Sequence, residues 1–286
     1  MFKKILLGVI SALGFWAYLE TKLFKIKYYK VGHNNIKLLH ISDIHLWSTQ
    51  KLKLKFITSL KSQNIDLIIV TGDNISSNKA IEKLIESFKK AKLNKVPGVF
   101  VFGSNDYFSP KPANPLQYLF HPSSQTNNYT NKTTLDTKRL RAGFEFLGWQ
   151  FVENKTINLN IKKTNIQITG SSDYHLPQNR SNIFLIKNPA NQKTIIIGLT
   201  HAPYKDALKP YLTNKTNYIF AGHTHGGQLR LPKIEALVTN SDLPRQYAAG
   251  VFKIKDSVIS ISEGLGTAAY FPFRFLCPPA VTILEI

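Results

Sequence analysis

Five apolar stretches of the sequence are each followed by residue types that bind metals. Asp43 and His45 follow IKLLHIS, Asp73 follows LIIVTG, Asn105 and Asp106 follow VFVFGS, His201 ends TIIIGLTH, and His223 and His225 end YIFAGHTH. In α/β sheets, functional sites form just beyond the carboxyl ends of strands, so residues far apart in the sequence converge there. The D-x-H and H-x-H spacings put both side chains of each pair on the same side of an extended turn.

Carboxylate and amide oxygens mixed with imidazoles suit Mn²⁺, Fe or Zn²⁺ better than an all-oxygen calcium site or a thiolate site. A single D-x-H is weak evidence, because a second one occurs at Asp173-Tyr174-His175. The ordered series after successive apolar runs is what indicates a metal site. The lone cysteine, Cys277, excludes an intramolecular disulfide and a multi-cysteine cluster.

The elements that would position these residues alternate between apolar runs and amphipathic stretches, which is typical of α/β sandwiches. Helical spacing occurs at 53–62 and 79–92. Buried strands are expected at 36–42, 67–72, 99–104, 166–171, 194–201 and 218–225, and closing strands at 250–255, 257–262 and 281–286. Short turns separate the closing strands and predict antiparallel pairing.

The series resembles the signature of calcineurin-like metallophosphoesterases, D-x-H…G-D…G-N-H-[DE]…H…G-H-x-H. Within that superfamily, SDIHL (42–46), GHTHGGQLRLP (222–232) and GLGT…FPFRFLCPP (264–279) are most similar to bacterial phosphodiesterases of the YkuE/YaeI type. The resemblance implies an α/β fold, a four-layer α/β/β/α sandwich with two mixed sheets and a metal site at one edge. It also implies metal-dependent hydrolysis of phosphate esters, as a phosphodiesterase or pyrophosphatase.

The resemblance further implies two divalent ions, with Mn²⁺ favoured and Fe or Zn²⁺ as alternatives. One ion would be held by Asp43, His45, Asp73 and His225, and the other by Asp73, Asn105, His201 and His223. Asp73 would bridge the two ions, and a hydroxide shared between them would attack the phosphorus, because bound cations lower the pKa of water towards neutrality.

The chain departs from the signature at Gly103-Ser104-Asn105-Asp106. We expect Asn105 to keep the ligand position and Asp106 to replace the histidine that assists the leaving group. A carboxylate near two cations is expected to be ionised and hence a poor acid. Asn105 and Asp106 are therefore the candidate catalytic residues.

Three further residues are candidates for substrate binding. Arg230 and Arg274 carry the planar fork that suits phosphate, with a structural salt bridge as the alternative for each. His175, with Asp173, follows a predicted strand and could line the same edge; a solvated turn is the alternative.

The N-terminal segment is strongly apolar over residues 5–19. This run is shorter than the ~20 residues that span a bilayer. Trp16 and Tyr18 at its end favour an uncleaved interfacial anchor, with a buried helix as the alternative. We therefore divide the chain into an anchor or signal-like segment (1–20), a basic linker (21–35) and a catalytic domain (36–286) with an insertion loop (109–138).

The chain carries 37 Lys and Arg against 17 Asp and Glu, a net charge of +20. Such an excess favours anionic partners. We expect a phosphoester substrate, including a lipid-linked one, and a membrane contact through the N-terminus, with no specific nucleic acid. Lysines after the apolar run favour a catalytic domain on the cytoplasmic side. A nuclease on the same scaffold, or a phosphate-binding scaffold with weak catalysis, is the alternative.

Overall fold

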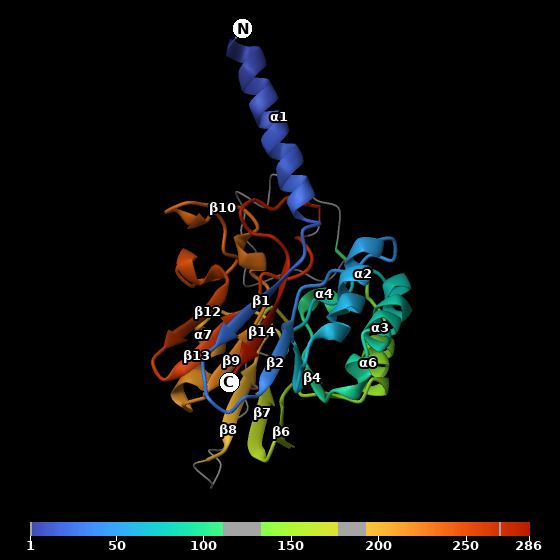
Figure 1. Cartoon of the computed structure of the whole chain (residues 1–286), viewed down its shortest axis with the longest axis vertical. Helices are drawn as coiled ribbons and strands as arrows, with labels where there is room; N and C mark the ends of the chain where they lie inside the picture. The colour runs from blue at the N-terminus through green and yellow to red at the C-terminus, as the bar shows by residue number, and fades with distance from the viewer. Residues whose placement is uncertain (1, 111–132, 177–192, 269) are drawn as a thin grey trace.

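Successive side chains along a strand point to opposite faces of its sheet. In β3 (Leu67–Val70), Leu67 and Ile69 pack between the two large sheets, whereas Ile68 and Val70 pack under helices. The computed structural model describes residues 2–110, 133–176, 193–268 and 270–286. Within those ranges, one hydrophobic cluster lies between the sheets and one under each helical layer. The predicted four-layer α/β/β/α fold with two mixed sheets is confirmed (Figure 1).

The first sheet has the strand order β1-β14-β2-β3-β4-β5 and consists of β1 (Lys25–Lys30), β2 (Lys37–Ile41), β3, β4 (Gly98–Phe100), β5 (Trp149–Phe151) and β14 (Ala280–Glu285). The second has the order β12-β13-β9-β8-β7-β6 and consists of β6 (Lys155–Ile161), β7 (Thr164–Gly170), β8 (Ile195–Leu199), β9 (Tyr218–Ala221), β12 (Gly250–Ile254) and β13 (Ser257–Ile261). A small sheet pairs β10 (Arg230–Leu231) with β11 (Glu235–Ala236).

Helices cover the outer faces of both sheets. The first sheet is covered by α2 (Lys51–Ser59), α3 (Ile81–Lys90) and α6 (Thr137–Phe146) (Figure 1). Leu208 and Tyr211 of α7 (Lys205–Thr213) pack on the second sheet. Short helices lie at α4 (Ser104–Tyr107), η1 (Leu60–Ser62), η2 (Asn78–Ala80), η3 (Leu93–Lys95), η5 (His225–Gly227) and η6 (Arg245–Ala248).

Strand direction gathers the loops that carry the predicted ligands. β2, β3 and β4 are parallel, as are β7, β8 and β9. β14 runs antiparallel to β2 and leads to the C-terminus, which lies far from α1 (Phe2–Glu20) (Figure 1). The carboxyl ends of β2, β3 and β4 therefore point towards the end of the molecule that bears α1.

The N-terminal region differs from the predicted division. Residues 25–30 are not a linker, because they form β1, which pairs along its whole length with β14. Helix α1 stands out from the rest of the molecule (Figure 1), and apolar side chains such as Leu7 and Phe15 are 65% and 64% exposed. In the described ranges, no helix combines the length and apolar character that crossing a membrane requires.

The predicted strands are found, with one difference in topology. β12 and β13 are antiparallel neighbours as expected, but the last strand, β14, crosses to the other sheet and lies between β1 and β2. Most of the predicted 109–138 loop lies outside the described residues. At the described ends of this range, the Ser109 N–H donates a hydrogen bond to the Thr133 carbonyl. Helix α6 begins at Thr137, which lies inside the predicted loop.

Candidate metal centre

The backbone is left-handed at most of the predicted metal ligands. Positive φ angles occur at Asp43 (48°), His45 (43°), Asp73 (54°), His223 (70°) and His225 (51°). A non-glycine residue in this region costs about 1–3 kcal/mol and persists where the surrounding structure enforces it, commonly at functional sites. The tight turns that end β2, β3 and β9 thus aim these side chains at one another.

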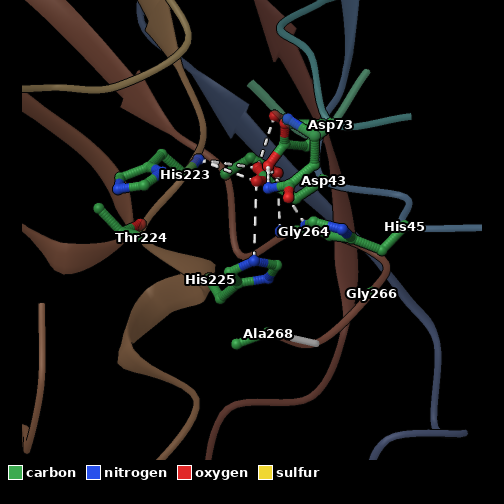
Figure 2. A network of polar contacts seen from close by, with 12 residues as sticks. Asp43, His45, Asp73, His223, Thr224, His225, Gly264, Gly266 and Ala268 are labelled. Carbon is green, nitrogen blue, oxygen red and sulfur yellow. Dashed lines mark hydrogen bonds and ion pairs between the residues drawn. The ribbon is translucent and has the colours of Figure 1, made fainter. Parts of the chain in front are cut away.

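The side chains meet in two overlapping groups. Asp43, His45 and His225 form one group, and Asp43, Asp73 and His201 form the other; within each, one ligand atom per residue lies within 4.8 Å of the others. Figure 2 shows His45 and His225 approaching the facing carboxylates of Asp43 and Asp73. The Oδ2 atom of Asp73 lies 3.4 Å from His45 Nε2 and 3.3 Å from His201 Nε2. One carboxylate oxygen therefore contacts histidines predicted to hold different ions.

The donor set fits divalent cations. Nε2 of His45 and of His201 is buried and has no hydrogen-bond partner in the described structure. The other ring nitrogen of His201, Nδ1, lies 2.6 Å from the carbonyl oxygen of Thr71, which fixes the ring with Nε2 towards Asp73. A metal-binding histidine is commonly oriented by such a carbonyl. Buried imidazole nitrogens facing carboxylates suit Mn²⁺, Fe or Zn²⁺.

Burial and neighbouring charges set the protonation of the site. Burial lowers the pKa of His45 to about 4 and holds that of His225 well below its usual range, so both rings are neutral at neutral pH. Burial alone would raise the pKa of Asp73, but His201, His45 and the Asn105 hydrogen bond hold it well below its usual range. His45 and His225 thus present neutral imidazoles and Asp73 an ionised carboxylate, which are the states that bind metals.

Two glycines allow the loops to approach the carboxylates closely. A Cβ at Gly222 would lie 1.9 Å from Ser42 Oγ and 2.3 Å from Asp43 Oδ2. A Cβ at Gly103 would lie 2.2 Å from Asp73 Oδ1. Neither position has room for a side chain, because the backbone there packs directly against a predicted ligand.

His223 joins the site differently from the other histidines. Its backbone N–H donates to Asp43 at 2.9 Å, and its ring centroid lies 5.3 Å from that of His201 and 4.5 Å from that of His175.

His175 is not on a solvated turn, because its side chain is fully buried. Its Nδ1 lies 2.9 Å from Asp173, and its Nε2 lies 3.3 Å from the Tyr204 hydroxyl. His175 therefore lies beside a predicted ligand, and its substrate role stays a prediction.

The two candidate arginines are both engaged within the protein. Arg230 forms an ion pair with Glu235, which is the structural alternative considered for it. Arg274 is fully buried and donates to backbone carbonyls, so it is not available to bind a phosphate. The prediction of Arg274 as a substrate contact is therefore wrong, and among the described residues it forms no salt bridge, which was its structural alternative.

The sequence profile of the family described as calcineurin-like phosphoesterase matches residues 36–227. The chain belongs to this family. It is thus an enzyme of the metallophosphoesterase class, as its motifs predicted.

This phosphoesterase is similar to several curated proteins over nearly their whole length. It is 27% identical to the uncharacterized metallophosphoesterase YkoQ of Bacillus subtilis, over 89% of this chain and 85% of that protein. It is 27% identical to the UDP-2,3-diacylglucosamine pyrophosphatase LpxG of Chlamydia muridarum, over 94% and 92%. It is 22% identical to the phosphodiesterase YaeI of Escherichia coli, over 96% and 93%.

The structure corrects the role predicted for Asp106. This carboxylate is fully buried and accepts hydrogen bonds from the backbone of Asn74 (2.7 Å), Ile75 (3.4 Å) and Gly103 (3.1 Å) and from the Asn74 amide (3.0 Å). These four hydrogen bonds make Asp106 a link between the β3 and β4 loops, which is a supporting role that the sequence analysis did not consider.

Asp106 corresponds to the acidic fourth residue of G-N-H-[DE] when the two are aligned without a gap, which agrees with this position. In that alignment Asn105 stands at the histidine and Ser104 at the asparagine. Asn105 donates its amide N–H to Asp73 Oδ2 at 2.6 Å, so it lies beside the predicted bridging carboxylate. The role of Asn105 as a metal ligand stays a prediction.

Three supporting residues were missed by the sequence analysis. They are Lys53, which donates to the Ile44 carbonyl between Asp43 and His45, and the two glycines Gly264 and Gly266. Asp173 was noted beside His175, but its contact was not foreseen: it accepts a hydrogen bond from the Ser104 backbone. GLGT and FPFR were noted for their resemblance, but only the folded chain brings them under the ligand turns.

Proposed function

We propose that this chain hydrolyses phosphodiester or pyrophosphate bonds with two divalent cations, of which Mn²⁺ is favoured. The position of Asp73 carries the proposal. Its Oδ2 lies at nearly equal distances from His45 and His201, each assigned to a different ion. A shared carboxylate is what two cations about 3.5–4 Å apart require.

When bound, such a pair would supply a hydroxide nucleophile at neutral pH and would stabilise both the attacking and leaving oxygens. The chain's own residues prepare the site for it. Asp43, His45 and His225 would hold one ion, and Asp73, Asn105, His201 and His223 the other. Since residues 104–106 offer no imidazole, we expect the enzyme to favour substrates whose leaving group departs without a strong acid.

The relatives support this class of substrate. LpxG is named as a pyrophosphatase acting on UDP-2,3-diacylglucosamine, and YaeI as a phosphodiesterase. We propose a substrate of the same chemistry, a phosphoanhydride or phosphodiester that includes lipid-linked molecules. The net charge of +20 would favour its approach.

We also propose that α1 holds the enzyme on a membrane surface, with the catalytic domain on the cytoplasmic side. The support is an isolated helix whose apolar side chains are exposed around its circumference, including Ile5, Leu7 and Ile10. A helix that is apolar all round is normally surrounded by protein core or lipid. Lys22 and Lys25 follow it and would meet anionic headgroups.

Hydrolysis of bis-p-nitrophenyl phosphate tests the proposed activity. We expect turnover that EDTA abolishes and Mn²⁺ restores, and no turnover by Asp73→Asn. Full activity in the chelator, or an Asp73→Asn rate equal to that of the natural sequence, would contradict the proposal. No turnover with any divalent ion would favour the phosphate-binding scaffold. Efficient nicking of plasmid DNA beside slow hydrolysis of the small ester would favour the nuclease.

A further inference from the structure

Arg274 is fully buried, and in the described structure it forms no ion pair with a carboxylate. Within the described ranges, its guanidinium donates only to backbone carbonyls, apart from a long contact to the Cys277 sulfur. The acceptors are Gly266 (2.6 and 3.1 Å), Glu263 (2.6 Å), Cys277 (2.9 Å), His225 (3.3 Å) and Gly264 (3.3 Å). A buried charge is costly unless it is compensated. Here the backbone carbonyls compensate the guanidinium charge, and this arrangement indicates that Arg274 has a specific structural role.

The carbonyls that Arg274 binds belong to segments that contact the predicted ligands. His225 is itself a predicted ligand. Gly264 and Gly266 lie against the turn of the first D-x-H motif, where Gly266 donates its N–H to the Asp43 carbonyl at 2.6 Å. A Cβ at Gly264 would lie 2.7 Å from Asp43 Cβ, and one at Gly266 would lie 2.7 Å from His45 Cβ. Figure 2 shows Gly264 and Gly266 next to Asp43 and His45.

We propose that Arg274 is a positioning residue for the ion held by Asp43, His45 and His225. Its guanidinium hydrogen-bonds to carbonyls of the 263–266 loop and of His225 and keeps them in one arrangement. The 263–266 loop in turn contacts the turn at Asp43 and fixes its conformation. Five N–H donors in a rigid plane can satisfy several carbonyls at once, whereas a lysine offers three donors on a flexible stem. The inference rests on the proposed metal centre.

The last turn of α1 fixes the backbone of the segment that carries Arg274. The Arg274 N–H donates to the Ala17 carbonyl at 2.8 Å. The carboxylate of Glu20 accepts from Leu276 at 3.1 Å and from Cys277 at 2.6 Å, and Glu20 is only 4% exposed. Arg274 thus joins the foot of α1 to the ligand turns, and Glu20 should influence metal binding through it.

Titration of the metal-free, full-length protein with Mn²⁺ tests this inference. Loss of a residue that orients metal ligands typically weakens metal binding 10–100-fold. We expect Arg274→Met to weaken one of the two Mn²⁺ sites by that factor and Arg274→Lys to weaken it less. Glu20→Gln should show a smaller loss of the same site. Hydrogen exchange of the metal-free protein should show faster exchange at residues 263–267 in Arg274→Met.

Leu208→Ala is the matched control, because Leu208 is a buried residue of α7 and belongs to a separate hydrophobic cluster. It should lower Tm but leave both Mn²⁺ affinities unchanged. Unchanged affinity in Arg274→Met, or an equal loss in Leu208→Ala, would overturn the positioning role. If Arg274→Met does not fold, unchanged affinity in both Arg274→Lys and Glu20→Gln would overturn it. Absence of Mn²⁺ binding by the natural sequence would instead contradict the proposed function.

Discussion

At the scale of single residues, the site is a set of strained turns held in place by buried polar contacts. The residue types and their spacing were sufficient to predict which side chains converge. They were not sufficient to predict the support beneath them, because Lys53, Asp173 and Arg274 act through backbone contacts that leave no local pattern. The role of Asp106 could not be derived either, since the same acidic residue could face a substrate or bind the N–H groups of two loops.

The corrected position of Asp106 leads to a prediction about stability rather than catalysis. Asp106→Asn places an NH₂ group against N–H donors of Asn74 and Gly103, so at least one donor loses its acceptor. An unsatisfied buried donor costs about 1–3 kcal/mol. Denaturant unfolding should show this loss in the free energy of unfolding. A plot of log kcat/KM against leaving-group pKa should keep the slope of the natural sequence; a changed slope would show that Asp106 acts on the leaving group.

The charge state of His201 predicts that metal binding depends on pH. Burial alone would lower its pKa, but the Asp73 and Asp173 carboxylates hold the pKa of the imidazole well above its usual range. The ring is therefore protonated at neutral pH without metal, and binding must displace that proton.

Affinity for Mn²⁺ should accordingly rise with pH, by up to about tenfold per pH unit below that raised pKa. Calorimetry in buffers of different ionisation enthalpy should detect about one proton released on account of His201. His201→Gln should remove this release, and the same proton count in that variant would contradict the assignment.

At the scale of elements, the central strands were predictable, whereas of the edge strands β1, β5, β6 and β12 only β12 was predicted. β3 and β8 are continuous apolar runs, because strands buried on both faces must be apolar. β1 reads KIKYYK and is largely exposed on one face, so its sequence resembles a basic linker. Its place beside β14 depends on pairing across the whole chain, which no local pattern encodes.

This pairing fixes where the N-terminal segment can be removed. A variant lacking residues 2–16 keeps Ala17, Glu20 and β1, so we expect it to fold and to retain kcat/KM on bis-p-nitrophenyl phosphate. A variant lacking residues 1–29 loses these contacts and most of β1, and its Tm should fall sharply. Equal Tm values for the two variants would show that β1 and Glu20 contribute little to the fold.

The shorter deletion also tests the membrane proposal. In flotation with anionic vesicles, we expect the full chain to bind and the 2–16 deletion to stay unbound. The matched control is Leu7→Lys/Ile10→Lys, which keeps the helix length but places charges on its apolar surface. Binding by either variant at the level of the natural sequence would contradict the role of α1.

At the scale of the whole molecule, each half of the chain supplies part of one site. The first sheet contributes Asp43 and Asp73 from the ends of β2 and β3, and the second contributes His201 and His225 from the ends of β8 and β9. The inter-sheet hydrophobic layer, which includes Leu38 and Ile197, holds the two sets of ligands together. The proposed metal centre would therefore depend on the packing of the two sheets as well as on its predicted ligands.

The most direct test of a two-metal centre bridged by Asp73 is the number of Mn²⁺ ions bound per chain. Calorimetric titration of the metal-free protein should give two ions for the natural sequence. Asp73→Asn should bind at most one ion tightly, because both ions would lose the charged oxygen that they share. A single site in the natural sequence, or two unaltered sites in Asp73→Asn, would contradict the account.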